Sequence, residues 1–223
     1  MRNAPIPTLL LCVTLLALPA TAQNDLYDNG PINGQNYAWT INYGWVVSNT
    51  FNLTTCNQGW GQSCNINGLA FGAWLFPGDV LESVEVSITS SEFGGTTYFD
   101  QVVNLVQSNC FGTQYQGTPY DVCTETASAG WGGWVNLING TYWLNLDNAV
   151  VNTGDPVYWD ENEGPSSASE TETGTIPSES FTVFGSSNTC LWCGYSIPEP
   201  GTLVLLGSGI VGLGSFLRFK MRR

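Results

Sequence analysis

The sequence predicts an all-β fold between residues 23 and 188, a two-sheet β-sandwich of jelly-roll-like form. Three observations support this class. Apolar side chains alternate with small or polar ones in several runs, which is typical of strands with one buried face. Gly, Pro and Asn interrupt these runs at short intervals, and no helical periodicity occurs between the two ends of the chain. Short strands of this kind without helices favour two packed sheets.

The N-terminus has the features of a secretory signal peptide. Arg2 gives a positive start, residues 9–18 form an apolar core, and Ala20-Thr21-Ala22 supplies small residues for cleavage. We therefore expect residues 1–22 to form a signal peptide helix that signal peptidase removes. The alternative, a retained membrane helix, is disfavoured because the apolar core is short and Pro19 ends it.

Period-two alternation identifies the strands. In residues 37–54, apolar side chains alternate with mostly small or polar ones. A break near Gly44 or Ser48-Asn49 is expected to divide this run into two strands. Two hairpins are expected, one around the turn Pro77-Gly78-Asp79 and one around Asn139-Gly140, because both turn sequences lie between apolar runs. Further strands are expected at residues 97–106, 157–159 and 179–184.

The remaining segments between these runs have the composition of loops. Residues 109–134 are rich in glycine and contain two cysteines, so they predict a long loop closed by a disulfide. Residues 163–175 are polar and acidic, which also predicts a loop, and residues 189–197 predict a linker to the C-terminal tail.

Cysteine usage agrees with export. Cys12 leaves with the signal peptide, and an even number of cysteines remains, which in an exported protein implies disulfides. Their short spacings favour the local pairs Cys56–Cys64, Cys110–Cys123 and Cys190–Cys193. The last pair also fits a redox motif, an alternative that is disfavoured because no strand-to-helix setting surrounds it.

The distribution of charge excludes several functions. Residues 23–197 contain no Lys, Arg or His, yet they hold 17 of the 18 acidic residues. Nucleic acid is excluded as a partner because its binding depends on Lys and Arg at phosphates. Catalysis with a His base and His-ligated zinc are excluded because these residues contain no His. Schiff-base chemistry is excluded because they contain no Lys.

The most site-like stretch is residues 155–165, where aromatic side chains lead into a cluster of acids. One interpretation is a calcium site that uses oxygen ligands from Asp160, Glu161 and Glu163. A second is a carbohydrate surface with an exposed tryptophan, whereas tryptophans on strands, such as Trp39, Trp45, Trp74 and Trp143, are expected in the core. The candidates for exposure are Trp60, Trp131, Trp134 and Trp159. The third interpretation is a solvated acidic loop.

Glycoside hydrolysis is the one enzyme class that two carboxylates can carry out without His, Lys or Arg. No acidic pair in this sequence has a spacing that marks it as catalytic. We therefore expect a protein that is not an enzyme, with a small secreted glycoside hydrolase as the alternative.

The C-terminal tail has three ordered parts. Pro198-Glu199-Pro200 precedes an apolar run at residues 203–217, and the basic residues of 218–223 close the chain. As a helix, the apolar run covers about 22 Å of a ~30 Å hydrocarbon core, which is short for a permanent anchor. The basic flank orients this transmembrane helix with its C-terminus in the cytoplasm. The alternative is a plain membrane anchor without processing.

These three parts in this order resemble the PEP-CTERM sorting signal. The resemblance covers residues 198–223 and implies recognition by exosortase, cleavage near the tripeptide Pro198-Glu199-Pro200, and delivery to the envelope or extracellular matrix of a Gram-negative bacterium. It says nothing of the domain's ligand. From the signal we expect an exported surface or matrix protein; the sequence leaves open whether it binds a glycan, with extracellular polysaccharide as its partner, or calcium, or neither.

Overall fold

The structure is a computed structural model that describes residues 24–35, 37–56, 63–129 and 133–187. In these residues the fold is all-β, with two antiparallel sheets and no helix, which confirms the predicted class at this level. Across the same ranges, no helix is long and apolar enough to cross a membrane. The predicted signal peptide, the pair Cys190–Cys193, the linker and the sorting tail lie outside the described residues.

The first sheet is built around one long central strand. Its strands are β1 (Asn24–Asp28), β2 (Ala38–Thr40), β4 (Cys64–Leu75), β7 (Val106–Tyr115), β8 (Thr118–Ser128), β9 (Val135–Leu137), β11 (Tyr158–Asn162), β14 (Ser178–Glu179) and β15 (Phe181–Ser187). The main order is β1-β15-β4-β11-β14, while β8 and β9 also pair with β4, β7 pairs with β8, and β2 pairs with β11.

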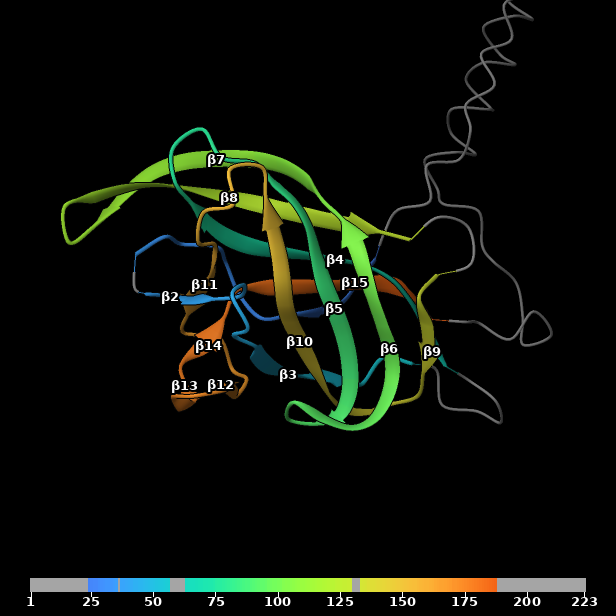
Figure 1. The fold of residues 1–223 in the computed structure, drawn as a ribbon. Coiled ribbons are helices and arrows are strands. Elements are labelled where there is room, and N and C mark those ends of the chain that lie inside the picture. Colours follow the sequence, from blue (N-terminus) through green and yellow to red (C-terminus); the bar gives the residue numbers. More distant parts are fainter. Residues whose placement is uncertain (1–23, 36, 57–62, 130–132, 188–223) are drawn as a thin grey trace, which may run out of the picture.

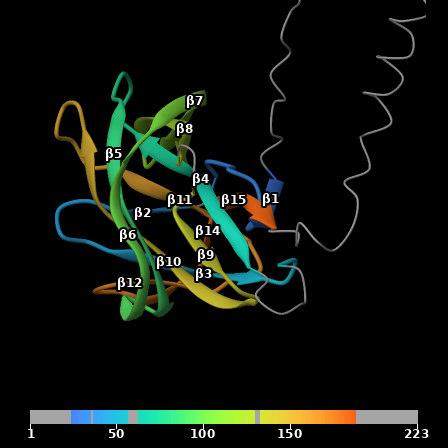
Figure 2. The same cartoon turned by 90° about the vertical axis from the view of Figure 1, so that its right-hand side faces the viewer.

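The second sheet contains β3 (Val47–Leu53), β5 (Leu81–Ser91), β6 (Gly94–Asn104), β10 (Gly140–Val151), β12 (Ala168–Glu170) and β13 (Gly174–Ile176). Its order is β13-β12-β3-β10-β5-β6, so β6 is an edge strand that pairs only with β5 among the described strands. In Figure 1, β10, β5 and β6 lie in front of β4 and β15 and run across them, and Figure 2 shows the two layers from the side.

A single hydrophobic cluster fills the space between the sheets. Val84, Val86 and Ile88 of β5 are buried, as the alternation of their segment predicts. The largest fully buried side chain is Trp159, whose ring lies 6.1 Å from that of Phe71, measured between centroids. Its indole N–H donates a 2.8 Å hydrogen bond to a backbone carbonyl oxygen, which satisfies the one polar group that its burial removes from water.

Two of the three predicted disulfides lie in the described residues, and both are confirmed. Cys56–Cys64 connects the segment after β3 to the start of β4, and therefore links the two sheets. Cys110–Cys123 joins β7 to β8, with its Cα atoms 4.1 Å apart. Each bridge constrains the unfolded chain and so stabilises the fold.

Both predicted hairpins are wrong, although the strands beside the turns exist. The turn at Pro77-Gly78-Asp79 leads from β4 in the first sheet to β5 in the second. Likewise β9 pairs with β4, while β10 pairs with β3 and β5. Neither Asn139 nor Gly140 has the positive φ that a two-residue hairpin turn requires, and the Asn139 side chain instead accepts a hydrogen bond from the backbone N–H of Cys56.

Two predicted loops contain strands. Most of residues 109–134 belongs to the long β7–β8 hairpin, whose turn residues Gln116 and Gly117 both have positive φ. Residues 163–175 contain β12 and the start of β13, which pair with each other. The Glu170 carboxylate accepts hydrogen bonds from the backbone N–H groups of Glu172 and Thr173 between those two strands, and these bonds stabilise the turn.

Candidate functional site

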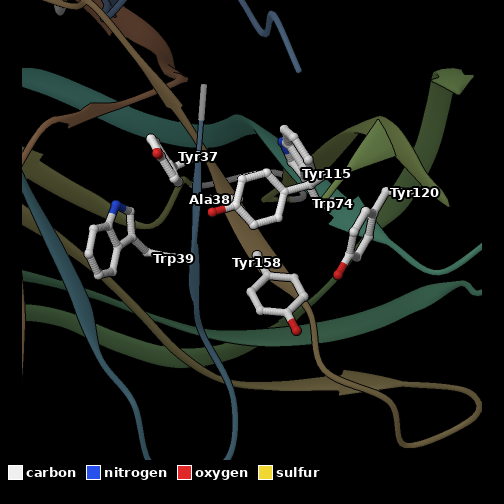
Figure 3. A pocket seen from close by; sticks show the side chains of 7 residues that line it. All are labelled: Tyr37, Ala38, Trp39, Trp74, Tyr115, Tyr120 and Tyr158. Carbon is white, nitrogen blue, oxygen red and sulfur yellow. The ribbon is translucent and has the colours of Figure 1, made fainter. Parts of the chain in front are cut away.

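A cleft of about 260 Å³ opens on the first sheet, where β2, β4 and β11 meet the β7–β8 hairpin. Six aromatic side chains and one alanine line this aromatic cleft: Tyr37, Ala38, Trp39, Trp74, Tyr115, Tyr120 and Tyr158. Figure 3 shows Tyr37 and Trp39 on one side, Trp74 and Tyr120 on the other, and the rings of Tyr115 and Tyr158 between them.

Strand register brings these rings together. Tyr158 and Trp74 are directly opposite each other in the β11–β4 ladder, so their side chains lie on the same face of the sheet. Tyr115 and Tyr120 lie close to the turn of the β7–β8 hairpin, at the end of β7 and near the start of β8. The cleft therefore combines the face of a sheet with a wall formed by a hairpin.

The rings contact one another and hold the cleft in shape. Tyr120 packs against Trp74 and Tyr158, with centroid separations of 5.6 and 6.0 Å. Tyr37 meets Tyr115 edge to face at 5.5 Å. Tyr37 is 55% exposed, whereas Trp74 is 3% exposed, so the cleft has a wet rim and a buried base. Such tilted and edge-to-face pairs are favourable geometries for aromatic rings.

Asp160 is completely buried beneath the cleft and binds three N–H donors. Its carboxylate accepts hydrogen bonds of 2.6 Å from the Trp74 indole, 2.9 Å from the backbone of Asn33 and 3.1 Å from the backbone of Gly34. Burial raises the pKa of Asp160, and these bonds oppose that shift because they favour the ionised form. Asp160 therefore fixes both the Trp74 ring and the loop at residues 33–34.

That loop in turn touches the β7–β8 hairpin. The hydroxyl of Thr113 donates a 3.0 Å hydrogen bond to the carbonyl oxygen of Gly34. Gly34 has φ +60°, and a Cβ at this position would lie 2.9 Å from the ring of Phe111. Only glycine suits both the backbone conformation and the close approach of the hairpin.

Glu161 holds the other tryptophan of the cleft. Its Oε2 accepts a 3.1 Å hydrogen bond from the Trp39 indole N–H. Burial raises the pKa of Glu161, the Trp39 bond opposes that shift, and the neighbouring charge of Asp160 adds to it. Glu161 lies opposite Glu179 in the β11–β14 ladder. Glu179 is fully buried, and neither of its carboxylate oxygens has a hydrogen-bond partner among the described residues.

Of the three residues of the predicted calcium site, the structure brings Glu161 and Glu163 to the lining of one hollow but leaves Asp160 out of it. Asp160 and Glu161 are successive residues of β11, where side chains alternate between faces, and Glu163 follows the strand in an exposed position. Within the described ranges, no group of three or more acidic, His or Cys side chains is placed to hold a metal ion. Calcium binding at these residues stays a prediction. If it occurs, calcium should raise the melting temperature of the protein, and Asp160→Ala should abolish that rise.

The expected roles of the tryptophans are partly reversed. Trp159, a candidate for an exposed stacking residue, is fully buried in the core, and Trp134 stacks on Phe99 at 4.9 Å. The other two candidates, Trp60 and Trp131, lie outside the described residues. Trp74, expected in the core, is buried, and Trp39 packs against the core cluster; both also line the aromatic cleft.

The tyrosines of the cleft were not predicted as site residues. Alternation of apolar and polar residues indicates a strand, but it does not show which face of that strand lies against the β7–β8 hairpin. A signal was present at residues 115–120, where two tyrosines flank a Gln-Gly pair. A hairpin interpretation of that pair would have placed both rings near one turn.

Comparison with known proteins concerns the C-terminal tail. The family model described as the PEP-CTERM protein-sorting motif matches residues 196–223. No curated protein and no solved structure matches this chain. The motif implies an exported protein that is made as a membrane-anchored precursor, processed by exosortase, and delivered to the cell envelope or exterior. The chain therefore carries a PEP-CTERM protein-sorting motif, as its Pro198-Glu199-Pro200 tripeptide, apolar run and basic end predicted.

Proposed function

We propose that this protein is a non-catalytic glycan-binding protein of the cell surface or its matrix. Its scaffold is a jelly-roll-like β-sandwich, and its ligand is an extracellular polysaccharide. The observation that carries the proposal is the aromatic cleft, with six rings from five strands and the segment before β2 around about 260 Å³. The sorting motif accounts for delivery to the place where such a ligand occurs.

The chemistry of the cleft suits a sugar ring. A pyranose has an apolar face of C–H groups, which aromatic rings remove from water, and hydroxyl groups around its edge. The phenol groups of the four tyrosines place hydroxyl donors and acceptors beside those apolar faces, and the hydroxyl of Tyr115 already accepts a 3.0 Å hydrogen bond from the side chain of Gln116. Clefts that combine aromatic walls with a few polar groups are typical of small-molecule sites.

The test is calorimetric titration of the exported protein with a panel of oligosaccharides. Tyr37→Ala and Tyr115→Ala should each weaken binding of the best ligand by about tenfold, equivalent to ~1.4 kcal/mol. Tyr98→Ala is the matched control, since Tyr98 is a 40% exposed tyrosine on β6 of the other sheet. Absence of binding across the panel, or binding that both cleft variants leave intact, would overturn the proposal.

The non-catalytic part of the proposal is supported by the hydrogen bonds that the two buried acids near the cleft already accept, which leave one oxygen of Glu161 without a partner among the described residues. Asp160 already accepts three hydrogen bonds, and Glu161 accepts one from Trp39. Incubation with the best ligand should therefore release no reducing sugar. Release that disappears on changing a single carboxylate to its amide would instead identify the alternative, a small glycoside hydrolase.

A further inference from the structure

A second, more polar hollow of about 510 Å³ adjoins the aromatic cleft. Glu161, Asn162, Glu163 and Ser178 contribute to its lining, and we call it the carboxylate hollow. Tyr37 lines both the cleft and the hollow. A glycan chain that stacks on Tyr37 is therefore in contact with the border between the cleft and the hollow.

Glu161 presents an unused carboxylate oxygen here. The residue is 6% exposed and lines the hollow. Its Oε2 accepts the hydrogen bond from Trp39, whereas Oε1 has no hydrogen-bond partner among the described residues. Oε1 is not one of the fully buried oxygens without a partner, so it is open to the hollow, where a donor or a cation can reach it.

The side chains of the domain offer no cation. Residues 23–197 contain no Lys, Arg or His. Around Glu161 the neighbouring groups are also acidic: Asp160 precedes it, Glu163 lines the same hollow, and fully buried Glu179 lies opposite it in the ladder. Since no side chain of the domain supplies positive charge to Glu161, a cationic ligand meets no competing ion pair there.

An ammonium group fits this hollow better than a metal ion. It has three N–H donors, and Glu161 Oε1 and the exposed carboxylate of Glu163 supply acceptors for them. Calcium requires six to eight oxygen ligands, and the described residues contain no cluster of three acids arranged for a metal. An anionic sugar, in contrast, is repelled by every charge at the site.

We propose that the carboxylate hollow binds the ammonium group of an amino sugar, in a glycan whose neighbouring ring stacks in the aromatic cleft. This inference rests on the proposed glycan-binding function and assigns the chemical class of its ligand. The preferred polysaccharide contains free, protonated amines, and its fully acetylated or uronic acid counterparts bind more weakly.

The experiment compares three oligosaccharides of equal length on the full-length exported protein. They are a glucosamine oligomer, an N-acetylglucosamine oligomer and a galacturonic acid oligomer, titrated at about pH 6, where amines are protonated. The glucosamine oligomer should bind about tenfold more tightly than the acetylated one. That preference should shrink as salt is added, because an ion pair is screened and stacking is not.

Glu161→Gln and Glu163→Gln should each reduce the preference for the amine to less than about threefold. In the Glu161→Gln variant the new amide oxygen remains available to the Trp39 indole, so this change removes charge while keeping that contact. Glu92→Gln, on the β5–β6 turn of the other sheet, is the matched control for net charge and should leave the preference unchanged.

The outcomes separate the two proposals. Equal affinity for the amine and acetylated oligomers, with both dependent on Tyr37 and Tyr115, overturns the ammonium subsite and leaves the glycan-binding function standing. An amine preference that Glu92→Gln reduces as much as Glu161→Gln shows attraction to net charge alone and also overturns the subsite. No binding of any of the three sugars overturns both.

Discussion

At the scale of single residues, the buried carboxyl groups of this domain have different roles because their partners differ. Asp160 is saturated with N–H donors and positions the cleft. Glu125 of β8, also fully buried, has no hydrogen-bond partner for either carboxylate oxygen among the described residues. Since no basic side chain occurs in residues 23–197, each buried acid depends on N–H donors or on protonation.

We expect Asp160→Asn to destabilise the fold by about 2–4 kcal/mol, because the new amide group faces backbone N–H donors and the charge-assisted bonds are lost. Urea denaturation measures the change in the free energy of unfolding. Asp155→Asn is the control: its side chain is exposed and makes no hydrogen bond to the described residues, so its effect should stay within about 0.5 kcal/mol. Equal effects of the two variants would contradict the positioning role of Asp160.

Glu125 makes stability fall as pH rises. Burial raises its pKa from 4.5 to about 8, so the folded state binds more protons than the unfolded state between these values. The free energy of unfolding therefore decreases with increasing pH across that window. Glu125→Gln should make the decrease shallower in urea denaturation at a series of pH values. Some slope should remain, since burial also raises the pKa of Glu179. An unchanged slope would contradict this assignment.

At the scale of elements, the β7–β8 hairpin is the least expected feature and forms a wall of the cleft. β7 is exposed over most of its length, so it lacks the apolar alternation of a buried strand, whereas β8 is mostly buried or half-buried. The disulfide Cys110–Cys123 crosses it beside a bulge between Ser108 and Phe111. Tyr115 and Tyr120 then depend on this hairpin for their positions.

Removal of the hairpin disulfide should weaken glycan binding as well as stability. The double variant Cys110→Ser/Cys123→Ser should lose about 2–3 kcal/mol of stability and about tenfold in affinity. Cys56→Ser/Cys64→Ser is the matched control, because this bridge links the two sheets away from the cleft and should affect stability alone. Calorimetric titration below both melting temperatures compares them, and equal losses of affinity would contradict a specific role for the hairpin.

Strand positions were largely predictable from the sequence, whereas strand partners were not. Alternation such as that of Val84, Val86 and Ile88 is a local property that survives any pairing. The turn at residues 77–79 and the Asn139-Gly140 pair both carry the chain from the first sheet to the second. That choice depends on strands distant in sequence, so turn composition alone cannot decide it.

The sequence pointed to the neighbourhood of the candidate site but not to the residues that form the cleft. The acidic stretch at residues 155–165 does border the cleft, since Tyr158 lines it and Asp160 lies beneath it. The stacking rings, however, come from segments separated by more than a hundred residues, such as Tyr37 and Tyr158. Their convergence follows from the pairing of β2 with β11, which no local pattern reveals.

At the scale of the whole molecule, the folded domain and the sorting motif are consecutive segments. The last described strand, β15, ends at Ser187, and the motif begins at residue 196. The cleft proposed to bind a glycan and the sorting motif therefore lie in separate parts of the chain.

A chain that ends at residue 195 should be exported and folded but not sorted. Its melting temperature and its affinity for the best oligosaccharide should match those of the full protein, because no described strand is removed. Fractionation should find it in soluble fractions, whereas the full protein reaches the envelope or exterior. Loss of folding on truncation would show that residues 196–223 contribute to the domain.

The position of β6 at the edge of its sheet affects how copies of this protein associate at high concentration. Among the described strands, the outer edge of the 11-residue strand β6 has no partner, and such an edge is a template on which a second chain can extend the sheet. Asp100 lies on this strand, and the domain carries charge of one sign only, so two edges that approach each other repel. Acidification to about pH 4 neutralises carboxylates and removes this barrier. The solubility of this protein at high concentration is therefore expected to depend on pH. Static light scattering should rise sharply at about pH 4 and return to baseline on neutralisation.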